Sequence, residues 1–331
     1  MSAKTQAAGL GAKPDGVKRR SLRQGPERGG RWTRGGLALC TAFAMAAGHA
    51  APSGLPACPG AQAQTVLLSG QGPLESLAFD QQGRLLFTDI TAAALRRLDA
   101  PTSTPVTVAS GVRSPGGIAV AGAQEAYVGT GNTLTGLFPN LGKAGIAKVA
   151  LDTGIVTPVV SGLAMANGLV RADDGTFYAS DDLASSLDQV LPDGTVRRGW
   201  LPLNSNGLVL SPDQRTLYVN QMIPAKVWAI DRATGQQTLV MAAPPARQWS
   251  WLDGLGIDDA GRLYVAVYWA GEVWRVTPSN GQACVLAEGV FLPSAVTVGH
   301  QGQGFSPTSA YITTHSGKLL EVKDAVPVQT P

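Results

Sequence analysis

Four oxygen-bearing side chains occupy the same position of a repeated sequence motif. They are two carboxylates and two carboxamides, namely Glu75, Asn167, Asn206 and Asp253. Such groups suit a hard divalent cation, and calcium accepts about six to eight oxygen ligands, so water or substrate would complete the shell. No cysteine or histidine occupies this position, which disfavours a dedicated zinc site. The residues therefore predict a calcium site, with magnesium, manganese or a permissive zinc site as alternatives.

The motif that positions these residues occurs six times. In most copies an apolar run reaches an Asp-Gly or Asp-x-x-Gly turn and continues in a second run, which is typical of a β-hairpin. The copies begin at Glu75, Gly116, Asn167, Asn206, Asp253 and Ser294, with separations of 41, 51, 39, 47 and 41 residues. A third run follows in each unit, and a fourth in all units but the last. Six units of four short strands predict an all-β fold, a six-bladed β-propeller.

In a propeller, the residue that opens the innermost strand of each blade lies on one face around the central channel. We call these six residues the openers, and we expect four of them to converge on one cation. Asparagine and aspartate before glycine also serve as ordinary turn residues. That second interpretation remains open for the other three, but it does not explain Glu75, which is a poor turn former at the matching position.

The ends of the repeat region predict how the ring closes. The last copy supplies runs at residues 311–314 and 318–322 and has no clear fourth strand. Residues 66–70 resemble the fourth-strand endings at 108–111 and 159–162, so an N-terminal strand is expected to complete the last blade and remove an exposed edge. We therefore expect one domain over residues 64–323, followed by a C-terminal tail at 324–331.

Three stretches of the chain resemble a known family. Residues 75–80 (ESLAFD) are similar to its E-G-P-x-F-D opening, and residues 206–213 to its N-G-L-x-x-S-P-D-G motif; D-G-L at 253 with G-R-L-Y-V-A at 261 completes the set. The chain thus resembles the regucalcin/gluconolactonase (senescence marker protein-like) family of six-bladed propeller hydrolases, related to diisopropyl fluorophosphatase and paraoxonase. The likeness spans about residues 65–323.

This resemblance implies that Glu75, Asn167, Asn206 and Asp253 are the metal ligands. It also implies hydrolysis of a lactone or related ester, in which the cation polarises the carbonyl group, water attacks, and Asp253 acts as general base, with a role as nucleophile as the alternative. The sequence departs from the family at Gly168, where an Asp usually follows the third-blade Asn, and a paraoxonase-type histidine pair is not apparent. A non-enzymatic binding propeller of the cell envelope, with a structural metal, is the alternative.

The loops after each second strand should border the same face as the openers. For the substrate pocket they contribute Asp181, Asn220, Tyr268 and Trp269, and Trp251 precedes an opener. The aromatic residues are expected to wall an apolar pocket, although core packing is their other common role. His315 is a candidate proton-handling catalytic residue, or an ordinary loop histidine. The longer loop at 132–145 is interpreted as a lid or as a tolerated insertion.

Residues 1–63 are interpreted as an export signal and leader. Nine Lys and Arg residues in the first 34 precede an apolar run at 37–47 that is too short to span a bilayer. Cleavage is expected before Gln64, after an A-x-A pattern, with Gly48-His49-Ala50 as the other possible site. Arg19 and Arg20 also hint at twin-arginine export, and an unusual leader on a cytoplasmic protein is the other interpretation. The mature chain is expected in the periplasm or outside the cell.

Cleavage before Gln64 would leave Cys284 as the only cysteine. No internal disulfide would then be possible, and Cys284 is expected to be a packed thiol. Lipid attachment at Cys58 is the alternative that would anchor the chain to a membrane.

The net charge after the leader excludes one class of partner. From residue 64 onward the chain carries 17 basic and 21 acidic residues, a formal net charge of −4. A nucleic-acid partner requires a basic face, so none is expected. We expect a monomer without a transmembrane span, acting on a small molecule.

Overall fold

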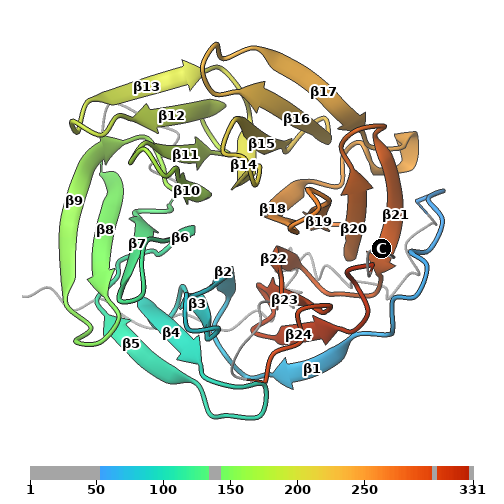
Figure 1. Ribbon diagram of the computed structural model, residues 1–331, viewed down its shortest axis with the longest axis horizontal. Coiled ribbons are helices and arrows are strands. Elements are labelled where there is room, and N and C mark those ends of the chain that lie inside the picture. The colour runs from blue at the N-terminus through green and yellow to red at the C-terminus, as the bar shows by residue number, and fades with distance from the viewer. Residues whose placement is uncertain (1–52, 134–142, 300–303, 328–331) are drawn as a thin grey trace, which may run out of the picture. The chain divides into compact units, whose positions relative to one another are not determined.

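The computed structural model describes residues 53–133, 143–299 and 304–327. Within these residues the chain forms 24 β-strands, a short 3₁₀ helix η3 (Pro245–Arg247) and no α-helix. The strands make six antiparallel sheets of four strands, which surround a common centre (Figure 1). The predicted all-β, six-bladed β-propeller is therefore confirmed. No helix in the described part of the chain is long and apolar enough to cross a membrane.

The first three blades follow the chain without interruption. Blade 1 contains β2 (Leu74–Phe79), β3 (Leu85–Asp89), β4 (Ala94–Leu98) and β5 (Val106–Ser110). Blade 2 contains β6 (Ile118–Val120), β7 (Glu125–Thr130), β8 (Ala144–Ala150) and β9 (Val156–Leu163). Blade 3 contains β10 (Leu169–Arg171), β11 (Phe177–Asp181), β12 (Ser186–Val190) and β13 (Val196–Leu201). In each blade the first strand is innermost.

The remaining blades repeat this order until the ring closes. Blade 4 contains β14 (Ser205–Leu210), β15 (Thr216–Gln221), β16 (Lys226–Asp231) and β17 (Gln237–Ala242). Blade 5 contains β18 (Leu252–Ile257), β19 (Leu263–Val267), β20 (Glu272–Thr277) and β21 (Gln282–Ala287). Blade 6 contains β22 (Pro293–Val298), β23 (Ala310–Thr314), β24 (Leu319–Val322) and, outermost, β1 (Thr65–Leu68).

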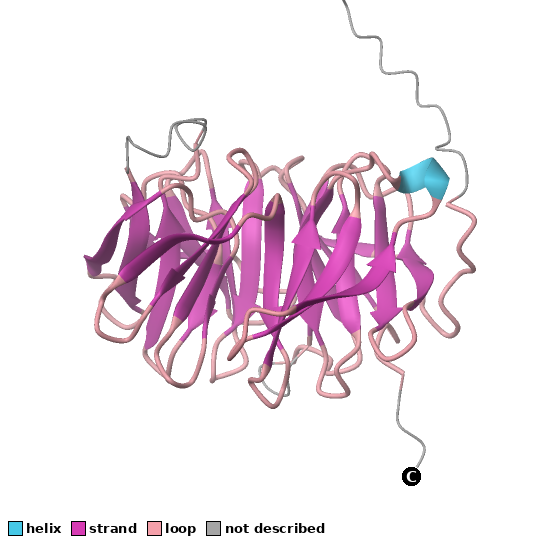
Figure 2. Ribbon diagram, turned by 90° about the horizontal axis from the view of Figure 1, so that it is seen from above, coloured by secondary structure: helices cyan, strands magenta, loops and turns pink. Residues whose placement is uncertain are grey.

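Strand β1 closes the ring as the sequence predicted. It pairs antiparallel with β24, with Thr65 opposite Glu321 and Val66 opposite Leu320. The last blade therefore combines strands from both ends of the described chain, and its outer edge is covered. Figure 2 shows that the strands run between two faces that carry the connecting loops.

The core lies between neighbouring blades. Six clusters of buried apolar side chains each join two adjacent blades, and one of them joins blade 6 to blade 1. Leu85 and Phe87 of β3, for example, pack with Tyr311 of β23. The second strands β3, β11, β19 and β23 are buried at every position because blades cover both of their faces. Each blade depends on its two neighbours for burial.

The predicted Asp-x-x-Gly turns form with a specific geometry. Between β2 and β3, Asp80 Oδ1 accepts hydrogen bonds from the backbone N–H groups of Gln82 and Arg84, both at 2.9 Å. Gly83 takes a φ of 74°, in the left-handed region that favours glycine. An ion pair of 2.7 Å joins Arg84 to Asp80. The same arrangement recurs between β18 and β19 around Asp258, so the sequence repeat encodes a repeated turn.

Glycines after the openers allow the innermost strands to approach one another. A Cβ atom added to Gly207 would lie 2.5 Å from the backbone oxygen of Asp253 and 2.5 Å from the backbone nitrogen of Leu255. Such contacts require the two strands to move apart. The spacing of the openers around the channel therefore depends on the absence of a side chain here.

This packing gives a stability prediction. Gly207→Ala should lower the free energy of unfolding by about 3 kcal/mol, because backbone atoms of the next blade must shift. Gly289 is the control, since it has a φ of 69° but nothing within 4 Å of an added Cβ; Gly289→Ala should cost about 1 kcal/mol. Urea unfolding measures both values, and equal losses would contradict the close-approach argument.

Candidate active site

The four predicted ligand residues lie together where the central channel meets a pocket. Glu75, Asn167, Asn206 and Asp253 line both the channel, a cavity of about 200 Å³, and the pocket above it, of about 490 Å³. Their exposed fractions lie between 3% and 9%. They thus form the floor of a pocket large enough for a small molecule.

Irregular strand pairing places the openers at the channel. In blades 1, 4 and 5 the register between the two innermost strands shifts around the opener, as a β-bulge does. The shifts fall between Leu74 and Leu77, between Ser205 and Leu208, and between Leu252 and Leu255. A bulge re-aims the side chains next to it. In blade 3 Asn167 precedes β10, and its backbone N–H donates to Ser180 O at 3.2 Å.

Buried polar side chains tie one blade to the next behind the openers. Asn220 of β15 is fully buried, and its Nδ2 donates to the backbone oxygen of Asp253 at 2.7 Å. Ser294 Oγ donates to the backbone oxygen of Leu74 at 2.6 Å, which joins blade 6 to blade 1. Asn220 was predicted to face the substrate pocket, but it does not line the pocket and instead supports the Asp253 backbone.

Two adjacent aspartates after β11 have different surroundings. Asp181, predicted for the pocket, does not line it; its Oδ1 accepts the backbone N–H groups of Leu183 and Ala184 at 2.9 and 2.8 Å. Asp182 lines the pocket, and its Oδ1 is buried without a hydrogen-bond partner in the described structure. Burial and the charges of Glu75 and Asp181 raise the pKa of Asp182 to about 7. The sequence pattern pointed to Asp181 rather than to its neighbour Asp182; the adjacent pair of aspartates was the available signal.

Glu75, His315 and Tyr268 form a hydrogen-bonded chain. His315 Nε2 lies 2.7 Å from Glu75 Oε2, and His315 Nδ1 lies 2.9 Å from the Tyr268 hydroxyl. Burial lowers the pKa of His315, but the hydrogen bond and charge of Glu75 outweigh it and raise this pKa to about 9. At neutral pH His315 is therefore charged and donates to Glu75. Burial, with the charges of Asp253 and Glu75, raises the pKa of Tyr268 to about 12.

Asp253 is a second acid of the pocket with a raised pKa. Burial and the neighbouring charge of Glu75 raise the pKa of Asp253 well above its usual value, while His315 and a hydrogen bond from Asn206 oppose the increase. Three acidic side chains, Glu75, Asp182 and Asp253, thus share this pocket with the positive side chain of His315. This is the electrostatic setting in which a cation would be held or a proton taken up.

Three aromatic side chains form one wall of the pocket. The ring centroids of Trp251 lie 5.7 Å from those of both Tyr268 and Trp269, and Tyr268 lies 4.9 Å from Trp269. Trp269 remains 55% exposed, and Trp251 has a φ of 61°, rare for a large side chain. All three line the pocket, so the aromatic residues predicted for it lie beside the openers.

The loop interpreted as a lid is described only at its ends. Asn132 and Thr133 line the pocket, and Asn167 Nδ2 makes a long hydrogen bond of 3.5 Å to Asn132 Oδ1. Residues 134–142 lie outside the described residues, so the predicted lid has no structural account.

The donor set is compatible with a hard cation. It offers carboxylate and amide oxygens and, in Asp182, a buried carboxylate oxygen with no hydrogen-bond partner among the described residues. Within the described ranges, no three His, Cys, Asp or Glu side chains lie close enough together to hold a metal ion without other ligands. A cation would therefore require the amide oxygens of Asn167 and Asn206 as well as the carboxylates.

The fold and pocket define a six-bladed β-propeller with buried carboxylates and amides at one mouth of its channel. Residues 71–316 match the family described as the SMP-30/gluconolactonase/LRE-like region, and the chain belongs to this family. The predicted resemblance is therefore confirmed. Membership indicates a lactonase-type hydrolase.

Individual relatives agree with this assignment. The chain is 29% identical over 216 residues to regucalcin of Xenopus laevis, which covers 61% of this chain and 70% of the relative. A gluconolactonase from Xanthomonas campestris has a similar structure, with a TM-score of 0.64, 21% identity, and coverage of 78% of this chain and 89% of that one. A luciferin-regenerating enzyme gives a TM-score of 0.57 at 15% identity, covering 80% and 95%. The structural likenesses show the shared fold.

The departure from the family at Gly168 has a packing reason. A Cβ at this position would lie 2.4 Å from the backbone oxygen of Asn206 and 2.8 Å from Ser180 Oγ. An aspartate does not fit between blades 3 and 4 in this arrangement. Asp182 supplies a carboxylate to the pocket from the neighbouring loop.

The raised pKa values give a pH prediction for protein freed of divalent cations. The contribution of the charged His315 is fully present below its unfolded pKa of about 6.5 and is lost as pH rises through about 9. The folded state also keeps a proton on Asp182 up to about pH 7, so ionisation of this group lowers stability on the way. Together the two shifts predict that the free energy of unfolding falls by roughly 5 kcal/mol between pH 5 and pH 9.

Thermal melting in a chelator measures this fall. In His315→Gln the loss of stability above pH 6.5 should be smaller. Added calcium should reduce the loss of stability over the whole range, because it favours the ionised carboxylates. A stability that rises with pH in the chelator would contradict the electrostatic account.

Proposed function

We propose that the protein is an exported, calcium-dependent hydrolase that opens a lactone or cleaves a related ester in the pocket above the channel. The observation that carries this proposal is the burial of Glu75, Asn167, Asn206 and Asp253 on the floor of a small-molecule pocket. Family membership supports the reaction class, and the oxygen donors support the choice of calcium.

Glu75, Asn167, Asn206 and Asp253 would hold the cation. When bound, calcium would supply Lewis acidity toward the substrate carbonyl group and stabilise negative charge that develops on its oxygen. Magnesium, manganese and zinc are the other cations to compare, with zinc least suited to a site without histidine or thiolate ligands.

Asp253 is the proposed general base. It would accept a proton from the attacking water as the new C–O bond forms, and return it to the leaving oxygen as the ester C–O bond breaks. Its raised pKa brings its proton affinity closer to what this transfer needs. His315 would hold Glu75 in place through Nε2, and Tyr268 would fix the ring of His315 through Nδ1.

The aromatic wall supports a substrate with an apolar face. Trp251 and Trp269 offer flat surfaces next to the oxygen-rich floor, where a lactone ring or acyl group could pack while its carbonyl faces the openers. Asp182 and Asn132, across the same pocket, could accept or donate hydrogen bonds to substrate hydroxyl groups.

A non-enzymatic binding propeller of the cell envelope is the second candidate. The observation that favours it is the ion pair between His315 and Glu75, which partly neutralises the site by protein groups alone. In that case a metal would stabilise the ring, and the aromatic wall would bind a ligand without turnover.

Calcium binding is the first prediction of the proposal. Calorimetry on the mature protein should show one site, and Glu75→Gln and Asp253→Asn should each weaken binding at least 100-fold by removing a buried charge. Glu288→Gln is the matched control, because Glu288 is exposed and does not line the pocket. Unchanged calcium affinity in both pocket variants would refute the site.

Turnover separates the two candidate functions. Hydrolysis of lactones and aryl esters should stop on chelation and return with calcium. A chelator that lowers the melting temperature while no tested ester is hydrolysed in the presence of calcium would favour the binding propeller.

The aromatic wall gives a kinetic prediction. Trp269→Ala should raise KM for an aryl ester about tenfold and change kcat little, because the side chain contributes apolar contact and no chemistry. Trp249→Ala is the control, since Trp249 is 65% exposed and does not line the pocket. Equal effects of the two variants would argue against substrate contact with the wall.

A further inference from the structure

The segment before β1 packs against the ring. Cys58 N–H donates to Val285 O, and Val285 N–H donates to Pro56 O, both at 2.8 Å, so Ala57 forms a parallel bridge with β21. We call residues 53–64 the strap. It adds backbone pairing to the outer edge of blade 5, while β1, directly after it, pairs with blade 6.

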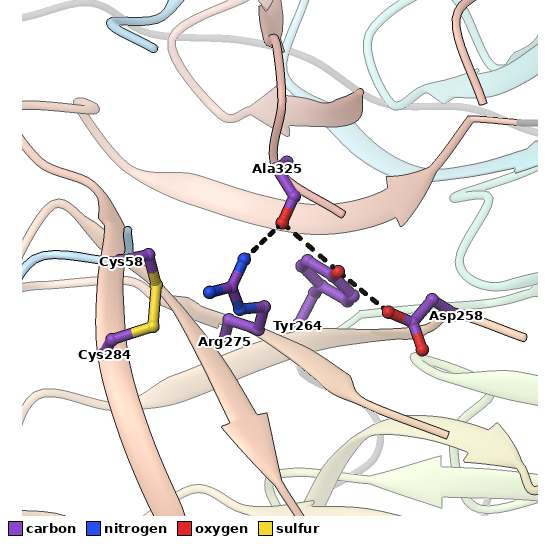
Figure 3. The surroundings of a disulfide bond; sticks show 6 residues. All are labelled: Cys58, Asp258, Tyr264, Arg275, Cys284 and Ala325. Atoms are coloured by element: carbon purple, nitrogen blue, oxygen red, sulfur yellow. Dashed lines mark hydrogen bonds between the residues drawn. A yellow bond between two sulfur atoms is a disulfide. The ribbon is translucent and has the colours of Figure 1, made fainter. Parts of the chain in front are cut away.

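A disulfide bond fixes the strap to blade 5. Cys58 is joined to Cys284 of β21, with 4.9 Å between their Cα atoms and 226 residues between them in sequence. Figure 3 shows the bond beside the outer strand of the blade. The expectation that Cys284 is an unpaired packed thiol is therefore wrong. Its partner Cys58 lies in the stretch that the sequence pattern indicated as part of a leader.

The rest of the strap is held to the ring by buried side chains and hydrogen bonds. Ser53 and Cys58 are buried, and Leu55 packs against the cluster between blades 4 and 5. Gln62 N–H donates to Lys323 O at 2.9 Å, and Gln64 Nε2 donates to Glu288 O at 2.8 Å. Cleavage before Gln64 would remove the contacts of Ser53, Leu55, Cys58 and Gln62 and expose the apolar residues beneath them.

The chain after β24 is held at the same two blades. Arg275 Nη1 donates to Ala325 O at 2.6 Å, and the Tyr264 hydroxyl lies 3.4 Å from the same oxygen (Figure 3). Ala325 is fully buried. Segments from both ends of the described chain therefore cover the junction between blades 5 and 6.

We infer that processing occurs N-terminal to Ser53, and that the mature protein keeps the strap as a covalent clasp formed by oxidation of Cys58 and Cys284 after export. In the oxidation each thiol loses a proton and an electron, two electrons in all, to a disulfide of the envelope oxidation machinery, which is reduced to the dithiol. Disulfides persist in oxidising compartments and are rare in the cytosol. A thiol in this bond cannot carry a lipid.

The test uses the full chain, expressed in a Gram-negative bacterium and purified from the cell envelope. N-terminal sequencing and intact mass should place the mature N-terminus before Ser53, for example after Ala50. Alkylation of the denatured protein should label no cysteine before reduction and two after it. An N-terminus at Gln64, a lipid on Cys58, or a free thiol before reduction would each overturn the inference.

Variants test the clasp itself. Cys58→Ser and Cys284→Ser, singly and together, should lower the melting temperature by about 5–10 °C, since the bond closes a long loop. The double variant should be no less stable than either single one. Cys40→Ser is the matched control and should change neither the melting temperature nor the thiol count of the mature protein. Melting temperatures of the cysteine variants equal to that of the control would refute a stabilising clasp.

Discussion

Two carboxylates, Glu75 and Asp253, are buried near one another at the centre of the ring, and much of the structure serves to hold them there. Their negative charges repel each other, and burial makes this repulsion stronger than it would be in water. His315 offsets part of the repulsion through its hydrogen bond to Glu75. A bound cation would offset the rest, which is why the same feature supports both a metal site and a catalytic base.

Ring closure is what brings these carboxylates together. Blade 1 carries Glu75 and blade 5 carries Asp253, and between them lies blade 6, which is completed only when β1 pairs with β24. The hydrogen bond from Ser294 to the Leu74 backbone ties blade 6 to the strand that holds Glu75. On the other side of blade 6, the strap links β1 covalently to β21 of blade 5 through the disulfide bond. Stability at the junction and geometry in the pocket are therefore linked.

The repeat made the fold and the floor of the pocket predictable. Each opener stands at a fixed distance from an apolar run and a turn, so its place at the channel follows from the period alone. The polar residues that line the pocket were less predictable than its aromatic wall, because near a strand end a shift of one residue changes the direction in which a side chain points. Asp181 and Asp182 differ in this way, and Asn220 turned out to support a neighbouring backbone.

The disulfide could not be predicted from spacing. Cys58 and Cys284 are far apart in sequence, and the small residues around Cys58 are typical of a leader as well as of a strand-like segment. Only the pairing of residues 56–58 with β21 distinguishes the two, and that pairing depends on the completed ring. The tight packing at Gly168 could not be predicted either, because the atoms of Asn206 and Ser180 that surround it belong to other strands of the completed ring.

Anomalous diffraction from crystals soaked in manganese would show whether the buried openers hold one cation. We expect one strong peak at the junction of channel and pocket, within contact of Glu75 and Asp253, which disappears in Asp253→Asn crystals. A protein that shows no peak there, or whose peak lies elsewhere and persists in the variant, would contradict this expectation.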